Sequence, residues 1–250
     1  MKEFTIEKLK VRVYKDRGQM GEAAAGDVAA RMRETLAGRE RLRMVFASAP
    51  SQNELMEGLV RVQGVDWSRV EAFQMDEYVG LPGTAPQTRQ FFLQQRLFSR
   101  VKPGTIRLLD GMAQPPAECR RYADLVRESP IDIVCLGIGN NGHIALNEPH
   151  AADFEDPQTV KVVELDKVSL RQQVQTGVFT RVEDVPRFAM TLTVPALMSG
   201  AHIFCVVPGP SKREAVRQAL QGPLTPGCPA SILRTHPDCA LYLELDSHGK

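Results

Sequence analysis

A glycine-rich loop at residues 137–149 carries the side chains best suited to proton transfer. It reads GIGNNGHIALNEP and delivers one imidazole, His143, and one carboxylate, Glu148, five residues further on. A base and an acid on one loop are the equipment of general acid–base catalysis. Glycine and asparagine tolerate positive φ and let backbone N–H groups approach a ligand. These residues alone are equally compatible with a glycine-rich turn around a packed histidine.

A second acidic pair follows an apolar stretch at residues 70–75, which we expect to be a strand. Asp76 and Glu77 then lie at the carboxyl end of that strand. A carboxylate that is half-buried in such a place can have a raised pKa and act as a base. The alternative is an acidic turn on the surface.

Two predicted helices begin with serine after a turn, which favours an anion at their N-termini. Ser51 with Glu54, and Ser211 with Glu214, match the S-x-x-E capping box. A helix N-terminus offers free N–H groups and a positive dipole end, and Lys212 adds a cation to the second one. The alternative is that these serines only cap their helices.

The elements that must position these residues alternate between strands and helices. Strands are expected at 4–13, 42–47, 70–75, 106–108, 131–136, 160–165, 190–194, 202–207 and 240–245. Helices are expected at 21–36, 51–62, 87–98, 117–127, 195–198 and 211–220, with a helical turn at 230–233. The polar segment 166–181 fits neither pattern.

This alternation predicts a three-layer α/β/α, Rossmann-like fold with a mainly parallel, doubly wound sheet. We find no linker or repeat, so residues 1–250 are expected to form a single domain. In such sheets ligands bind at the carboxyl ends of the strands. No G-x-G-x-x-G follows the first strand, so a dinucleotide is not implied.

Composition narrows the functional classes. The net charge of +1 gives no field for nucleic-acid binding, and no apolar run is long enough to span a bilayer. The N-terminus has no apolar signal-peptide core, and metal-ligand spacing is absent. The five cysteines form no C-x-x-C, so we expect reduced thiols in a cytoplasmic protein, with Cys135 and Cys205 buried in strands.

Two sequence blocks together resemble the glucosamine-6-phosphate deaminase (isomerase) family. Its signature loop reads GxGxDGHIAFNEP, which residues 137–149 nearly repeat, and its MDEYVGLP is found at residues 75–82. Weaker similarity extends from about residue 41 to about residue 243. The resemblance implies isomerisation and deamination of a 2-amino-2-deoxyhexose 6-phosphate, giving fructose 6-phosphate and ammonia from glucosamine 6-phosphate. No metal or organic cofactor is implied, because the substrate's own carbonyl or iminium stabilises the carbanion.

The resemblance also implies roles for individual residues. Asp76 would move a proton between C2 and C1 of the open-chain sugar, and His143 would open the ring with Glu148 beside it. The substrate phosphate would be bound by Ser48, Ala49 and Ser51, with Lys212 and Arg171 as cations.

Three departures from the family pattern accompany these roles. Asn141 stands where the family has aspartate, and its amide can orient the imidazole but brings no charge. His143 would then have to rely on Glu148 alone. The family loop TGGTP is replaced by SAPSQ at residues 48–52, where Pro50 offers no N–H. The residues around Arg171 do not reproduce the family wording.

Two alternative functions stay open. The 6-phosphogluconolactonase family shares the fold and a GxGxDGHxAS-type loop, but typically lacks MDEYVGLP and the Asn-Glu-Pro ending of the loop. A non-catalytic sugar-phosphate binding protein is kept open by Asn141 and Pro50. The sequence leaves undecided the C4 epimer of the substrate, a homo-oligomeric state, and regulation by an N-acetylated sugar phosphate.

Overall fold

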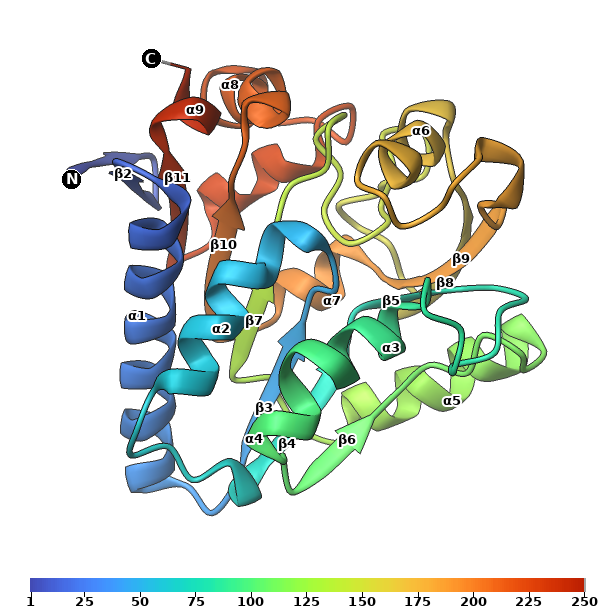
Figure 1. Cartoon of the computed structure of the whole chain (residues 1–250), viewed down its shortest axis with the longest axis horizontal. Coiled ribbons are helices and arrows are strands. Elements are labelled where there is room, and N and C mark those ends of the chain that lie inside the picture. The colour runs from blue at the N-terminus through green and yellow to red at the C-terminus, as the bar shows by residue number, and fades with distance from the viewer. Residues whose placement is uncertain (250) are drawn as a thin grey trace.

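An eight-stranded sheet forms the centre of the computed structural model, which describes residues 1–249 (Figure 1). The strand order is β1-β2-β11-β10-β7-β3-β4-β6, and every neighbouring pair is parallel except the β1–β2 hairpin at one edge. The strands are β1 (Lys2–Ile6), β2 (Leu9–Tyr14), β3 (Leu42–Phe46), β4 (Val70–Gln74), β6 (Thr105–Arg107), β7 (Ile133–Leu136), β10 (His202–Val207) and β11 (Cys239–Glu244). The segment expected as one strand at 4–13 is therefore a hairpin.

Helices cover both faces of this sheet, as the three-layer prediction required. One apolar cluster joins α1, α2 and α3 to one face, and a second joins α5, α7 and α8 to the other. Strand β7 shows the division, since Ile133 packs in the first cluster and Val134 in the second. Alternate residues of a strand point to opposite faces, so a strand buried on both sides reads as continuously apolar. The helices are α1 (Arg17–Gly38), α2 (Asn53–Arg61), α3 (Arg89–Leu93), α4 (Ser99–Val101), α5 (Pro115–Arg127), α6 (Lys167–Gln175), α7 (Val194–Met198), α8 (Arg213–Gln221) and α9 (Leu245–His248).

A second, antiparallel sheet extends from the end of β4, in the order β5-β9-β8. It consists of β5 (Asp76–Tyr78), β9 (Phe188–Leu192) and β8 (Val160–Glu164), with Asp76 opposite Thr191. The strands expected at 160–165 and 190–194 exist, but they build this separate sheet. Residues 166–181, which fitted neither pattern, contain α6. In Figure 1 this helix lies above β8 and β9.

Both predicted capping boxes are wrong. Helix α2 begins after a 3₁₀ turn at Pro50–Gln52, and α8 begins after a 3₁₀ turn at Pro210–Lys212. Proline fits the first position of a helical turn, so each turn begins at the proline, one residue before the serine. The residues at the N-caps are Gln52 and Lys212, and neither makes a side-chain cap. The Ser51 hydroxyl is thus not used in capping.

Other sequence expectations concern cysteines and membranes. All five cysteines are free and buried, with Cys135 in β7 and Cys205 in β10. Within residues 1–249 no helix combines the length and the apolar character needed to cross a membrane. The same residues contain no group of three or more His, Cys, Asp or Glu that could hold a metal ion.

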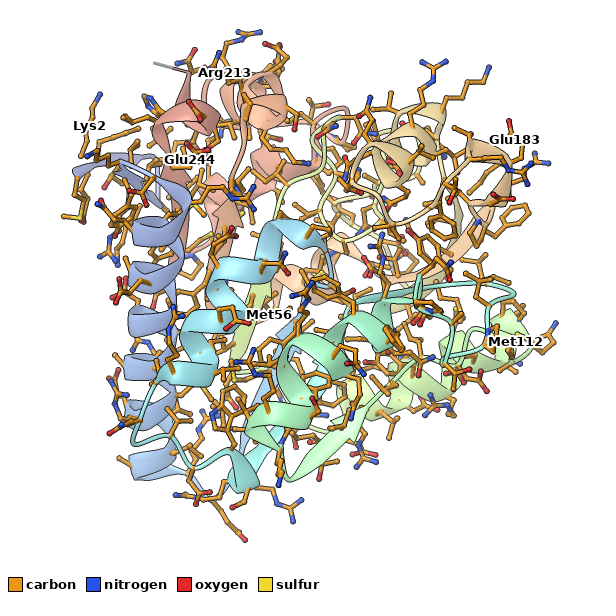
Figure 2. The ribbon with its side chains drawn as sticks, viewed as in Figure 1. Lys2, Met56, Met112, Glu183, Arg213 and Glu244 are labelled. Atoms are coloured by element: carbon orange, nitrogen blue, oxygen red, sulfur yellow. The ribbon has the colours of Figure 1, made fainter. Side chains whose placement is uncertain are left out.

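Met112, a 60% exposed apolar side chain, lies at the periphery in the loop before α5 (Figure 2).

Candidate active site

Four neighbouring strands of the central sheet end at one pocket. The loop after β10 supplies Lys212, the loop after β7 supplies His143, the loop after β3 supplies Ser48, and β4 is followed by Asp76. Helix α6 closes the pocket from the other side. Of the residues predicted for the site, the pocket is lined by Ser48, Ala49, Ser51, Asp76, His143 and Lys212. The carboxyl ends of parallel strands therefore gather side chains that lie up to 164 positions apart, from 48 to 212.

Two glycines of the loop after β7 are required by close approach. A Cβ at Gly139 would lie 2.1 Å from Cε1 of His143, so the imidazole rests directly over this backbone. A Cβ at Gly137 would lie 2.8 Å from Nε2 of Gln52, which donates to the Val206 carbonyl in β10. The glycines thus let the ring and the neighbouring turn pack against the end of β7.

His143 is oriented through its Nδ1 atom. Nδ1 lies 2.7 Å from Oδ1 of Asn141, 3.2 Å from Oγ of Ser169 and 3.4 Å from Oε2 of Glu148. An amide oxygen can only accept, so the hydrogen-bond pattern assigns the ring proton to Nδ1. Nε2 has no hydrogen-bond partner in residues 1–249, and it is the ring atom left for a ligand in the pocket.

The amide of Asn141 also connects two carboxylates. Its Nδ2 donates to Oε2 of Glu148 at 2.6 Å and to Oδ2 of Asp166 at 2.7 Å. Asp166 in turn caps α6 by accepting from the Ser169 N–H. The expectation that His143 relies on Glu148 alone is therefore wrong, because Ser169 contacts the ring directly and Asp166 holds the amide that orients it.

Glu148 is fully buried yet stabilised as an anion. Burial by itself raises the pKa of this carboxyl, but His143, Ser169 and Asn141 outweigh burial and hold the pKa below its usual value. A negative charge is thus kept on the Nδ1 side of the imidazole.

Asp76 is a buried carboxylate facing an arginine that the sequence interpretation missed. Burial raises its pKa, while Arg89, His143 and Ser48 act in the opposite direction without cancelling that effect. Nε of Arg89 lies 3.7 Å from Oδ1 of Asp76, beyond hydrogen-bond distance. A carboxylate with a raised pKa in a pocket has the properties of a general base.

Glu77 explains how Arg89 reaches this pocket. Its carboxylate accepts from the backbone N–H groups of Tyr78, Arg89 and Gln90, and so fixes the start of α3 against β5. Of the two adjacent acidic residues, Asp76 faces the pocket and Glu77 has a structural task. The sequence does contain a signal for Arg89. This arginine follows the acidic pair closely and is preceded by Thr88, the N-cap residue of α3.

The opposite end of the pocket is cationic. Lys212 is 7% exposed, and burial lowers its pKa to about 8. Within residues 1–249 it makes no ion pair; its Nζ is 3.5 Å from Oε1 of Gln172, which also accepts from the Asn140 N–H. A buried ammonium beside serines, with no carboxylate to neutralise it, is suited to an anionic ligand.

Arg171 does not take part in the pocket. Its side chain is exposed on α6, and the helix instead directs Gln172 and Gln173 toward the pocket. Residues 172 and 173 follow Arg171 by 100° and 200° of helical rotation at about 100° per residue, so only part of α6 can face the site. The predicted phosphate contact of Arg171 has no geometric support here.

Comparison with known proteins gives the chain a set of relatives. The family model described as glucosamine-6-phosphate isomerases/6-phosphogluconolactonase matches residues 15–241. Glucosamine-6-phosphate deaminase 1 of Giardia intestinalis is 39% identical over 193 residues, covering 76% of this chain and 71% of the relative. A glucosamine-6-phosphate deaminase of Listeria welshimeri is 36% identical over 200 residues, covering 80% of this chain and 83% of the relative.

Solved structures agree with this result. A monomeric glucosamine-6-phosphate deaminase superimposes with a TM-score of 0.87 and 28% identity, covering 95% of this chain and 98% of that one. The 6-phosphogluconolactonase of Thermotoga maritima superimposes with a TM-score of 0.77 and 19% identity, covering 95% and 100%. The second likeness is one of fold.

Proposed function

Because this chain belongs to the glucosamine-6-phosphate isomerase/6-phosphogluconolactonase family, we propose that it converts glucosamine 6-phosphate to fructose 6-phosphate and ammonia. Relatives of that activity match at 34–39% identity. The observation that carries the proposal is the position of Asp76, a buried carboxylate with a raised pKa, in one pocket with His143 and Lys212. A phosphate site, a ring-opening base and a carbon base are the three groups that this reaction needs.

The phosphate occupies the cationic end of the pocket. Lys212 supplies charge, Ser48 and Ser51 supply hydroxyls, and the Asn140 N–H supplies a backbone donor. Pro50 removes one N–H from the turn, so lysine and hydroxyl contacts carry more of the recognition.

His143 opens the sugar ring. Its Nε2 accepts the proton of the C1 hydroxyl and returns it to the ring oxygen. During this step the Nδ1–H of His143 remains hydrogen-bonded to Oδ1 of Asn141. The lowered pKa of Glu148 keeps an anion beside the imidazolium that forms transiently.

Asp76 then performs the isomerisation. Its carboxylate takes the proton from C2 of the open chain and delivers it to C1, while a proton passes from the amino group to O1, which leaves a hydroxyl at C1 and an imine at C2. Water hydrolyses that imine and releases ammonia, giving the ketose phosphate. Burial favours this role, because a raised pKa makes a carboxylate a stronger proton acceptor.

Phosphate binding requires the Gln172 side chain to move away from the cationic end of the pocket. The pocket has a volume of about 80 Å³, whereas small-molecule sites are usually about 300–1,000 Å³. Gln172 on α6 occupies the donors of Lys212 and Asn140 that we assign to phosphate.

Hydrolysis of 6-phosphogluconolactone is the second candidate. A lactonase needs a base and a water molecule, but no acceptor for a carbon-bound proton. Asp76 within the MDEYVGLP block, and the Asn147-Glu148-Pro149 ending of the loop, favour the deaminase. The free, buried thiols support a cytoplasmic location, where such sugar phosphates occur.

The test is an ammonia-release assay on glucosamine 6-phosphate, with galactosamine 6-phosphate and 6-phosphogluconolactone in parallel. We expect ammonia and fructose 6-phosphate in equal amounts from the first compound. Turnover of the lactone alone would replace the proposed function with the second candidate, and no turnover of any of the three would leave a binding protein.

A further inference from the structure

The site contains a guanidinium, that of Arg89, which the mechanism above does not use. We propose that Arg89 is a catalytic residue whose Nε–H donates to O1 of the open-chain sugar, stabilising the charge that develops there when Asp76 takes the C2 proton. This inference rests on the proposed function, since it assumes that Asp76 acts on an amino-sugar phosphate.

The guanidinium is held in place by groups of the protein itself. Nη1 donates to the Ser48 carbonyl at 2.9 Å, and Nη2 donates to Oε1 of Gln173 at 3.4 Å. The group lies 4.7 Å from the ring centroid of Tyr78, and the backbone N–H of Arg89 is held by Glu77. Arg89 is only 6% exposed, so it is a rigid, water-poor donor of the kind that transition-state stabilisation requires.

One donor of this group is left free, and it points to the base. Nε of Arg89 and Oδ1 of Asp76 are both buried without a hydrogen-bond partner in residues 1–249, and they face each other at 3.7 Å. A purely structural ion pair would close to hydrogen-bond distance and satisfy both atoms. Since both line the pocket, the free pair is matched to a ligand oxygen that accepts from Nε–H beside the carboxylate.

The reaction identifies that oxygen. When Asp76 takes the C2 proton, the C2–H electron pair forms the C1=C2 double bond, and the π pair of the C1 carbonyl moves onto O1. Of the two carbons that Asp76 serves, C1 bears this oxygen and C2 bears nitrogen. Arg89 transfers no proton in this step, and its charge is unchanged because guanidinium stays protonated at all relevant pH values. It lowers the barrier by binding O1 more strongly as the charge grows.

The experiment compares Arg89→Gln and Arg89→Lys with Arg100→Gln, a control that removes an exposed arginine paired with Glu57 outside the pocket. Loss of one preorganised donor should lower kcat by about 10²–10³ in both Arg89 variants, with KM changed by less than about threefold. Exchange of the C2 proton with solvent should fall by the same factor. Arg100→Gln should match the wild type. Lysine keeps the charge but has no N–H at the Nε position. If the glutamine variant folds poorly, the lysine variant therefore still tests whether this N–H is needed.

Binding of two inhibitors separates a catalytic from a structural role. A five-carbon aldonohydroxamate phosphate has a planar oxyanion like that of the enolate formed here, whose C2 bears an amino group, whereas 2-amino-2-deoxyglucitol 6-phosphate is saturated at C1. We expect the Arg89 variants to lose affinity for the hydroxamate by the factor lost in kcat, and to bind the saturated compound nearly normally. Equal loss for both inhibitors, or a rise in KM at constant kcat, would overturn the inference. A wild type that does not turn over glucosamine 6-phosphate would overturn the proposed function itself, whatever the variants do.

Discussion

Oδ1 of Asn141 lies 2.7 Å from Nδ1 of His143, so the residue that departs from the family pattern still orients the imidazole. Its Nδ2 atom adds what an aspartate could not, because it donates to Glu148 and Asp166 together. The two carboxylates are thereby held close to each other with a neutral donor between them. The amide at position 141 and the carboxylate at position 166 thus form one matched arrangement.

Replacing Asn141 with aspartate should destabilise the protein rather than restore a family feature. Asn141→Asp keeps the acceptor for His143 but removes both donated hydrogen bonds and adds a third carboxylate. Hydrogen bonds to charged groups contribute about 1.5–3 kcal/mol each, so we expect the free energy of unfolding to fall by about 3 kcal/mol or more. Denaturant unfolding at pH 7 is the measurement.

Two controls accompany this variant. Asn141→Asp combined with Asp166→Asn should recover most of the loss, because the new amide can donate to the new carboxylate. The loss in Asn141→Asp should also shrink as the pH falls, since protonation of one carboxylate relieves the repulsion. If Asn141→Asp is as stable as the wild type, the side chains at positions 141, 148 and 166 separate easily, and the predicted loss of stability is wrong.

Lys212 should give the substrate affinity a pH dependence. Burial lowers the pKa of Lys212 to about 8, so its ammonium is present below that pH and is lost as the pH rises through it. We expect KM for the sugar phosphate to rise above pH 8. The slope of this rise should approach about tenfold per pH unit. Arginine stays protonated, so Lys212→Arg should remove this rise even if its KM at pH 7 is poorer. A KM that climbs equally in both proteins would assign the effect to another group.

Removal of the cation should weaken binding of the phosphate in particular. A charge-assisted hydrogen bond contributes about 1.5–3 kcal/mol, so Lys212→Ala should raise KM by about tenfold or more. Unphosphorylated glucosamine should be nearly inert with the wild type. The idea fails if phosphorylated and unphosphorylated sugars are turned over equally well.

Gln172 should compete with the substrate. Its Oε1 accepts from the Asn140 N–H at 2.9 Å and lies 3.5 Å from Nζ of Lys212. Breaking these contacts is part of the cost of binding, and a typical hydrogen bond contributes about 0.5–1.5 kcal/mol. Gln172→Ala should therefore lower the Kd for inorganic phosphate by roughly two- to tenfold, as titration calorimetry can measure. An increased Kd would make Gln172 a ligand instead of a competitor.

The sequence was sufficient for the parallel strands of the central sheet and for the position of four candidate site residues. Apolar runs such as 131–136 identify strands buried on both faces, and the loops after them must meet at one edge. His143, Asp76, Ser48 and Lys212 accordingly lie in one pocket. This part follows from periodicity and topology, which local sequence encodes.

What the sequence could not provide depends on contacts between distant segments. Arg89 reaches Asp76 only because Glu77 accepts from three backbone N–H groups at the start of α3. Asp166 meets Asn141 only after α6 has packed over the loop. The role of Arg171 was implied only by the family resemblance, in a segment where no helix was predicted, and a polar helix gives little periodic signal for its inner face.

The central claim is that Asp76 carries the C2 proton of glucosamine 6-phosphate, and a reaction in D₂O followed by NMR tests it most directly. The wild type should produce ammonia and fructose 6-phosphate with deuterium at C1. Asp76→Asn should fold and bind the sugar phosphate but incorporate no deuterium and release no ammonia, because only the proton acceptor is lost. Undiminished deuterium incorporation by Asp76→Asn, or a wild type that releases no ammonia, would contradict the account.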